Sequence, residues 1–135
     1  MTKTKIVYLG DLHTECTHES GAKIGTDAPK DNMGKGKDFS PTDLFAASLG
    51  SCMMTIMAIQ AKKLGVELKG TQVEVEKQMS VADKRRIAKI IVRFQCPTLP
   101  NPLVREKLEQ AAIDCPVHLS VHPDVKIEVD FVWGL

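Results

Sequence analysis

The sequence has few aromatic residues and no excess of one charge. Its 135 residues include four Phe, one Tyr and one Trp, and 18 basic residues against 17 acidic ones give a net charge of +1. Scarce aromatics argue against a platform that stacks nucleic-acid bases, and balanced charge argues against binding to anionic polymers or membrane surfaces. We therefore expect no nucleic-acid partner and no membrane partner.

A long apolar run and a leader segment are also missing. The apolar run at residues 44–59 is shorter than the roughly 20 residues that a membrane-spanning helix needs, and it contains Gly50 and three hydroxyl residues. The N-terminus enters a strand pattern without the apolar core of a signal peptide. These features predict a cytoplasmic protein with a single domain over residues 1–135.

The four cysteines do not form a recognisable metal or disulfide framework. Cys16, Cys52, Cys96 and Cys115 are widely spaced, and no C-x-x-C pair occurs. Zinc ribbons need such pairs, and structural disulfides are rare in reducing compartments. We interpret Cys16 and Cys96 as structural residues and consider the other two further.

Turn residues divide the chain into short strands and two longer helical segments. Alternation and β-branched content predict strands, and apolar residues at helical spacing predict helices. The expected order is strands at 5–9, 14–18 and 22–26, a loop at 27–39, a helix at 41–64, a strand at 66–79, a turn at 82–85, a strand at 87–94, a helix at 103–115, a short turn at 116–120 and a strand at 125–133. This order favours an α+β fold with antiparallel sheets.

The helix at residues 41–64 has a well-defined start and an apolar body. Ser40 is suited to the N-cap, Pro41 to the first helical position, and Asp43 to the third, where its charge favours the helix N-terminus. The following residues include few polar side chains, which predicts a helix buried on most sides with Cys52 inside the fold. Cys52 lies too far along the helix for the N-terminal amides to activate it.

Cys115 falls on the apolar stripe of the second helix and is predicted to point inward. If the two helices pack with the Cα atoms of Cys52 and Cys115 about 4.4–6.8 Å apart, the cysteines can close a reversible disulfide. The alternative is that both are independent, inert core residues.

Two segments resemble the signatures of the OsmC/Ohr family. Ser-Pro-Thr-Asp-Leu-Phe-Ala-Ala-Ser-Leu-Gly-Ser-Cys at residues 40–52 is similar to the first signature, and Cys-Pro-Val-His-Leu-Ser at residues 115–120 is similar to the second, with His118 at a position where the family has Ser. The resemblance implies an OsmC-like α+β fold, with antiparallel sheets around two central helices in an intertwined homodimer. It also implies a thiol-dependent peroxidase that reduces organic hydroperoxides without a cofactor.

The resemblance assigns roles to the two cysteines and leaves their activation open. Cys52 would be the peroxidatic cysteine and Cys115 the resolving one, and an external dithiol would reopen their disulfide. In active family members a Glu and an upstream Arg hold the thiolate, but here Thr42 stands at the Glu position and no Arg precedes Arg85. The candidates for thiolate activation are instead His118, Asp43 and Lys35.

Two other functions remain open. The spacing of Cys115, His118 and His122 is compatible with a metal, and His13, Cys16 and His18 form a looser cluster, but neither supplies four ligands, so we expect no metal. The chain could also have the fold without peroxidase activity and bind a small hydrophobic ligand, or a metal, at the dimer cleft.

Overall fold

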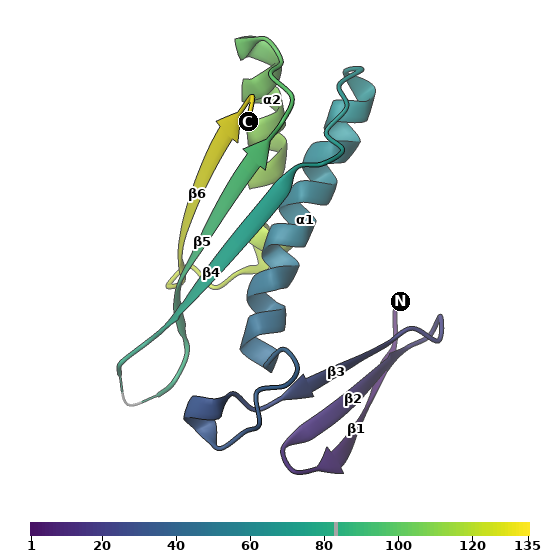
Figure 1. The fold of residues 1–135 in the computed structure, drawn as a ribbon, viewed down its shortest axis with the longest axis vertical. Helices are drawn as coiled ribbons and strands as arrows, with labels where there is room; N and C mark the ends of the chain where they lie inside the picture. The colour runs from purple at the N-terminus through teal and green to yellow at the C-terminus, as the bar shows by residue number, and fades with distance from the viewer. Residues whose placement is uncertain (83) are drawn as a thin grey trace. The chain divides into compact units, whose positions relative to one another are not determined.

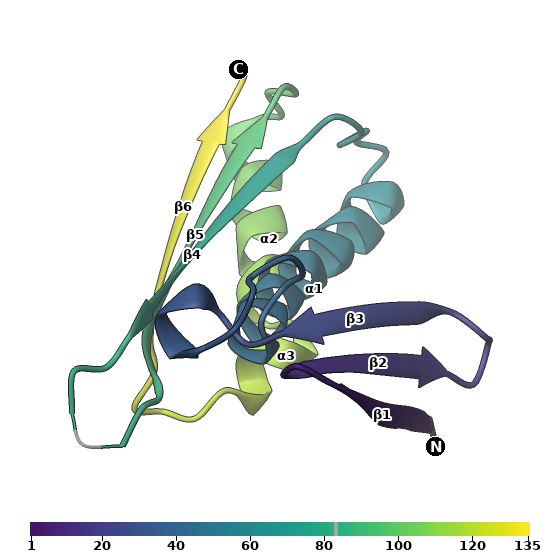
Figure 2. The ribbon, with the colours of Figure 1, turned by 60° about the horizontal axis from the view of Figure 1, so that its bottom comes forward.

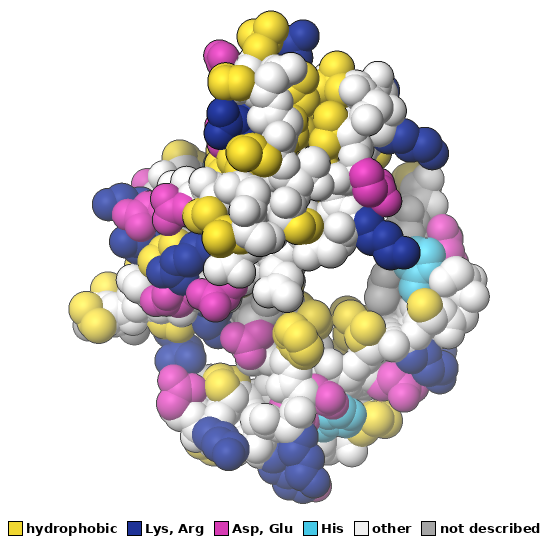
Figure 3. Space-filling model, turned by 45° about the horizontal axis from the view of Figure 1, so that its top comes forward, with side chains coloured by type: hydrophobic (Ala, Val, Ile, Leu, Met, Phe, Trp, Pro, Cys, Tyr) yellow, Lys and Arg dark blue, Asp and Glu magenta, His cyan; other side chains and the backbone are white. Residues whose placement is uncertain are grey.

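A computed structural model describes residues 1–82 and 84–135. These residues form two compact units, Met1–Phe45 and Ala46–Leu135 (Figure 1). The single domain expected over residues 1–135 stays a prediction, and each unit is described by itself below. On the face shown in Figure 3, basic and acidic side chains are interspersed, as the balanced composition predicts.

The first unit is an antiparallel meander followed by a loop. Strands β1 (Thr4–Gly10), β2 (His13–His18) and β3 (Lys23–Asp27) pair in the order β1-β2-β3. The loop that follows contains one short 3-10 helix, η1 (Lys30–Asn32). The predicted meander and loop are therefore confirmed.

The second unit packs helices against one face of a three-stranded sheet. Its elements are most of α1 (Pro41–Lys63), β4 (Gln72–Met79), β5 (Ile87–Cys96), α2 (Pro102–Ile113), α3 (Pro116–Ser120) and β6 (Lys126–Trp133). The strand order is β4-β5-β6, and Figures 1 and 2 show α1 and α2 on the same side of this sheet. The mixed α+β class is confirmed.

The expectation that both sheets are antiparallel is wrong for one strand pair. β4 and β5 form the predicted antiparallel hairpin, but β5 and β6 run parallel, with Val92 opposite Val129 and Phe94 opposite Phe131. Parallel strands require a long crossover, and here α2 and α3 supply it. A pattern of alternating residues does not reveal strand direction, so the sequence left this point undetermined.

Several element boundaries also differ from the predictions. β4 begins at Gln72 rather than at residue 66, β5 continues to Cys96, and α2 ends at Ile113 rather than at Cys115. Residues 116–120, predicted as a short turn, form the single-turn helix α3. The turn predicted at residues 82–85 includes Asp83, which lies outside the described residues.

The core of the second unit lies between α1, α2 and the sheet. Leu49, Met53 and Met57 of α1 are fully buried, as are Leu108 of α2 and Phe94 of β5. The ring of Phe94 stacks on that of Phe131, with centroids 4.8 Å apart. Residues four positions apart share a helix face, so this apolar stripe holds α1 against the sheet.

α1 is covered on one face only, which corrects the prediction that it is buried on most sides. Its buried residues form a single stripe, and the side chain of Ile59 outside that stripe is 49% exposed. α1 is also long and apolar enough to cross a membrane by length and composition alone. The buried stripe in contact with the sheet is instead typical of a helix within a folded domain.

The start of α1 has the predicted capping arrangement. The backbone N–H of Asp43 donates to Ser40 Oγ at 3.0 Å, and the backbone N–H of Ser40 donates to the Asp43 carboxylate at 3.0 Å. This reciprocal pair satisfies two backbone donors at the helix start.

Replacing Ser40 with Ala is expected to lower the free energy of unfolding by about 1 kcal/mol, because the Asp43 N–H loses its acceptor. Urea unfolding of Ser40→Ala and of Ser120→Ala measures this loss. Ser120 is an exposed serine whose hydroxyl donates to the carbonyl of Pro116. A loss no larger in Ser40→Ala than in Ser120→Ala would contradict the capping role.

Candidate functional site: a cysteine pair

Cys52 lies on α1, one position before the buried Met53, and is half-buried. The expectation that it lies inside the fold is therefore wrong for the single chain. Successive side chains of a helix point in different directions around its axis. Here Met53 is buried in the core, Ser51 is exposed, and Cys52 between them in the sequence is partly exposed. A partly exposed thiol can meet a small substrate, which a fully buried thiol cannot.

Cys115 lies at the junction of α2 and α3 and is fully buried. It was expected on the stripe of the second helix, but Pro116 disfavours helical geometry at the residue before it. Cys115 accordingly adopts an extended conformation, with φ −70° and ψ 148°, and becomes the N-cap of α3. Its Sγ accepts a hydrogen bond of 3.3 Å from the backbone N–H of His118.

The structure brings these two cysteines together, with a hydrogen bond between their side chains. Burial raises the pKa of the Cys115 thiol, and the hydrogen bond and the charge of Cys52 raise it further, while the backbone N–H groups of His118 and Val117 lower it. The Cys115 thiol is therefore held in its protonated form near neutral pH. Both are free thiols.

The side chain of His118 contacts the backbone of α2. Its Nδ1 lies 2.5 Å from the carbonyl oxygen of Ile113, which can only accept, so Nδ1 carries the proton. The residue thus touches Cys115 through its backbone N–H, and the imidazole ties α3 to the end of α2. Its proposed part in thiolate activation stays a prediction.

Lys35 and Asp43, the other two candidates for thiolate activation, have partners within the Met1–Phe45 unit. The Lys35 ammonium lies 3.7 Å from the carboxylate of Asp11, and the Asp43 carboxylate accepts the Ser40 N–H at the helix start. Asp43 therefore has a structural task, and Lys35 a surface ion pair. Neither contact tests a role at the thiols.

Cys16 and Cys96 were interpreted as structural. Cys96 is buried at the end of β5, where burial raises the pKa of its thiol and a hydrogen bond with Thr71 lowers it. Cys16 pairs across the first sheet with Ile6 and Ile24. Both positions are consistent with packing roles.

A cluster that the sequence did not predict lies in the first unit. His13, Asp27 and Asp38 place potential ligand atoms within 4.8 Å of one another, the one such group among residues 1–82 and 84–135. Of the two clusters considered from the sequence, the one around His118 is not in this group, and the one around Cys16 contributes His13 alone. The sequence could not reveal this cluster because His13 and Asp27 meet only through the register of β2 against β3.

The comparisons with known proteins agree on the fold. The OsmC-like protein family model matches residues 34–130. A solved structure from Psychrobacter arcticus, of a protein named for osmotic stress induction and detoxification response, is 41% identical with a TM-score of 0.93, and the alignment covers 98% of this chain and 96% of that one. No curated protein matches the chain.

More distant structures show the same fold. The Legionella pneumophila OsmC, an organic hydroperoxide resistance protein, is 18% identical with a TM-score of 0.77 over 97% of this chain and 96% of that one. A Vibrio cholerae organic hydroperoxide resistance protein, with captopril bound in one of its active sites, is 17% identical with a TM-score of 0.75 over 96% and 90% of the two chains. The family model and the fold together show that this chain belongs to the OsmC-like family.

Proposed function

We propose that this protein is a thiol-dependent peroxidase that reduces organic hydroperoxides through Cys52 and Cys115. The observation that carries the proposal is the contact between a half-buried thiol and a fully buried one that keeps its proton. Several proteins of this fold are named organic hydroperoxide resistance proteins, which supports this substrate class.

The first step uses Cys52 as the nucleophile. Its thiolate attacks the terminal oxygen of the hydroperoxide, the O–O bond breaks, and the alkoxide takes a proton to leave as an alcohol. Sulfur is oxidised to a sulfenic acid, and the peroxide is reduced. The hydrogen bond between the two side chains keeps Cys115 beside the reacting sulfur during this step.

Oxidation of Cys52 then prepares Cys115 to react. A protonated sulfenic acid carries no charge, so the negative charge on Cys52 that raised the pKa of Cys115 is lost. The N–H groups of His118 and Val117 remain to stabilise a Cys115 thiolate. That thiolate attacks the sulfenic sulfur, the S–O bond breaks, and a disulfide forms; the departing hydroxide takes up a proton, equivalent to the one lost from the Cys115 thiol, and leaves as water.

An external dithiol completes the cycle. One of its thiolates attacks the Cys52–Cys115 disulfide, a mixed disulfide forms, and the second thiol releases the reduced protein and a closed disulfide on the reductant. The cytoplasmic location expected from the sequence would supply such a reductant. Turnover therefore requires no cofactor beyond this partner.

We further propose that the protein is a homodimer. Ile59 on α1 is 49% exposed, and in the first sheet Ile6, Tyr8 and Ile24 are more than half exposed. Large apolar side chains exposed on each unit are candidates for contact with another chain. A second copy packed on the uncovered side of α1 would bury Ile59.

Replacing Ile59 with Glu is expected to raise the dissociation constant of the dimer at least about tenfold, ~1.4 kcal/mol, because a charge would be buried in the contact. Sedimentation at decreasing concentrations measures the change. Val81→Glu is the control, since this side chain is fully exposed. A monomeric wild type, or equal dissociation of both variants, would contradict the proposal.

A second candidate function is ligand binding without peroxidase activity. A groove of about 690 Å³ lies along the last turns of α1 and the segment after it, lined by Met54, Ala58, Lys62, Gly65, Val66, Glu67, Leu68 and Lys69. Its apolar floor and two lysines suit a small hydrophobic molecule with an acidic group. Peroxide-resistant thiols together with saturable binding of such a molecule would favour this function.

A further inference from the structure

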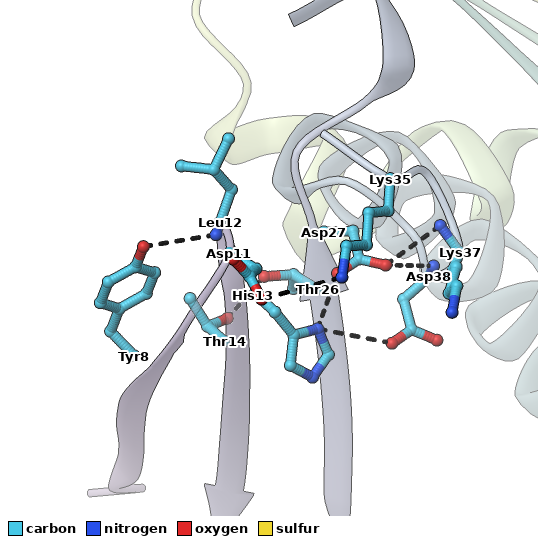
Figure 4. Close-up of polar contacts among 10 residues, drawn as sticks. All are labelled: Tyr8, Asp11, Leu12, His13, Thr14, Thr26, Asp27, Lys35, Lys37 and Asp38. Carbon is cyan, nitrogen blue, oxygen red and sulfur yellow. Dashed lines mark hydrogen bonds and ion pairs between the residues drawn. The ribbon is translucent and has the colours of Figure 1, made fainter. Parts of the chain in front are cut away.

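We propose that His13, Asp27 and Asp38 bind a divalent cation of the zinc class. His13 lies on β2, Asp27 lies opposite it on β3, and Asp38 lies near the end of the loop that follows. His13 Nδ1 is 2.7 Å from the Asp27 carboxylate and 3.8 Å from that of Asp38. Figure 4 shows the contacts of this one imidazole nitrogen with both carboxylates as dashed lines.

Asp27 is the fixed member of this group. Its side chain is 7% exposed, and its Oδ2 accepts the backbone N–H groups of Lys37 at 3.0 Å and of Asp38 at 2.9 Å. These two N–H groups fix one oxygen of a nearly buried carboxylate and leave the other, Oδ1, 2.7 Å from the imidazole.

Gly25 leaves room for the other two side chains. A Cβ at this position of β3 would lie 2.8 Å from Asp38 Oδ2 and 3.0 Å from His13 Cε1. Both distances are shorter than ordinary contacts of a carbon atom, so the side chains of Asp38 and His13 would have to shift to admit a side chain here. The glycine thus lets Asp38 and His13 approach one another over the strand.

The ligand set identifies the class of cation. One imidazole nitrogen and two carboxylate oxygens suit zinc and similar first-row ions, whereas calcium and magnesium prefer oxygen alone and copper(I) prefers sulfur. Zinc ligands lie about 2.0–2.2 Å from the ion, so two of them are separated by at most about 4.4 Å. His13 Nδ1 lies within this limit of both carboxylates, at 2.7 Å from Asp27 and 3.8 Å from Asp38, and the side chain of Asp38 is 49% exposed.

The surrounding charges permit a cation at this point. The two carboxylates supply negative charge for a cation, and the Lys35 ammonium lies 3.7 Å from the carboxylate of Asp11. The competing interpretation is that a protonated His13 bridges the two carboxylates as an ion pair and no metal binds. The partial exposure of His13 and Asp38 would leave a fourth ligand position open to water.

Calorimetric titration of zinc into the full chain tests this proposal. Because thiolates also bind zinc, the titration uses Cys52→Ser/Cys115→Ser in parallel with the wild type. We expect one zinc ion per chain to remain in the double cysteine variant. Binding that disappears with the cysteines would overturn the proposal.

Asp38→Asn is the decisive variant, with Asp124→Asn as its matched control. Asp124 lies 3.8 Å from His122 Nδ1, the same separation as in the Asp38 pair, but among the described residues that pair has no third ligand. We expect Asp38→Asn to weaken zinc binding at least about tenfold and Asp124→Asn to leave it unchanged. Equal affinities in the two variants would overturn the proposal.

Thermal unfolding in the Cys52→Ser/Cys115→Ser background supplies a readout that does not depend on these two cysteines. Zinc is expected to raise the Tm of this double variant alone and with Asp124→Asn, and to have no such effect when Asp38→Asn or Gly25→Ala is added. Their Tm values without zinc show whether these variants fold. Equal zinc-induced shifts in all four proteins would overturn the site, whatever the outcome for the peroxidase proposal.

Discussion

Replacing Cys52 with Ser is expected to lower hydroperoxide turnover by about a thousandfold or more, equivalent to at least ~4 kcal/mol of transition-state stabilisation. A serine hydroxyl is almost fully protonated near neutral pH and is a poor nucleophile toward an O–O bond. The exchange of sulfur for oxygen is nearly isosteric, and Cys52 is only half-buried, so the fold should persist. Loss of an organic hydroperoxide in the presence of a dithiol measures the effect.

Cys115→Ser should behave differently, because it removes resolution but leaves the first oxidation. One equivalent of peroxide is expected to react with Cys52 in a single fast phase, after which turnover through the disulfide stops. The sulfenic acid on Cys52 should then be trapped by a dimedone-type reagent. Failure of Cys115→Ser to consume the first equivalent of peroxide, or trapping of a sulfenic acid in Cys52→Ser, would refute the assigned roles.

The control for both variants is Cys16→Ser. Cys16 is a free thiol on β2, outside the compact unit that contains the cysteine pair. Its replacement changes the number of thiols without touching the proposed site, so turnover should match that of the wild type. A large loss in Cys16→Ser would show that sensitivity to thiol replacement is not specific to the pair.

Gly50→Val is expected to lower the free energy of unfolding by at least about 2 kcal/mol, because it overfills the contact between α1 and β4. Gly50 is buried in the middle of α1, and a Cβ there would lie 2.5 Å from Cγ2 of Val75. A glycine within a helix costs about 1 kcal/mol relative to alanine. The chain accepts this cost because the close approach of helix and sheet leaves no space for a side chain.

Two further variants isolate this contact. Ser51→Val introduces the same residue at the neighbouring exposed position of α1 and should change stability by only about 0.5 kcal/mol. Val75→Ala in the Gly50→Val background removes the clashing methyl groups and should recover part of the loss. Urea unfolding of all variants gives the coupling energy. Additive effects of the Gly50 and Val75 changes would contradict the steric account.

The sequence predicted the helices and strands well where their formation depends on residues that are neighbours in the sequence. The Ser40 cap, the proline at the start of α2 and the alternation in β6 each follow from local preferences, and the structure confirms these elements. The family resemblance is confirmed too. It could be recognised from the sequence because both of its signatures are continuous stretches of residues.

The sequence did not predict features that depend on distant parts of the chain. The parallel pairing of β5 with β6 and the pairing of His13 with Asp27 arise from strand register, which local patterns do not encode. Cys52 is partly exposed because the rest of the chain covers only one face of α1, and the apolar sequence of α1 does not show which face that is. The place of Cys115 was predictable in principle, since Pro116 opposes a helical conformation in the residue before it.

The most direct test of the account is mass spectrometry of the thiols after one equivalent of an organic hydroperoxide, with peroxide loss recorded in the same sample. The account predicts rapid peroxide loss and a disulfide that joins Cys52 to Cys115, while Cys16 and Cys96 stay reduced. This result would also show that a group other than the family's Arg and Glu supports the thiolate. Unchanged peroxide with four free thiols would contradict the account and direct attention to the groove beside α1.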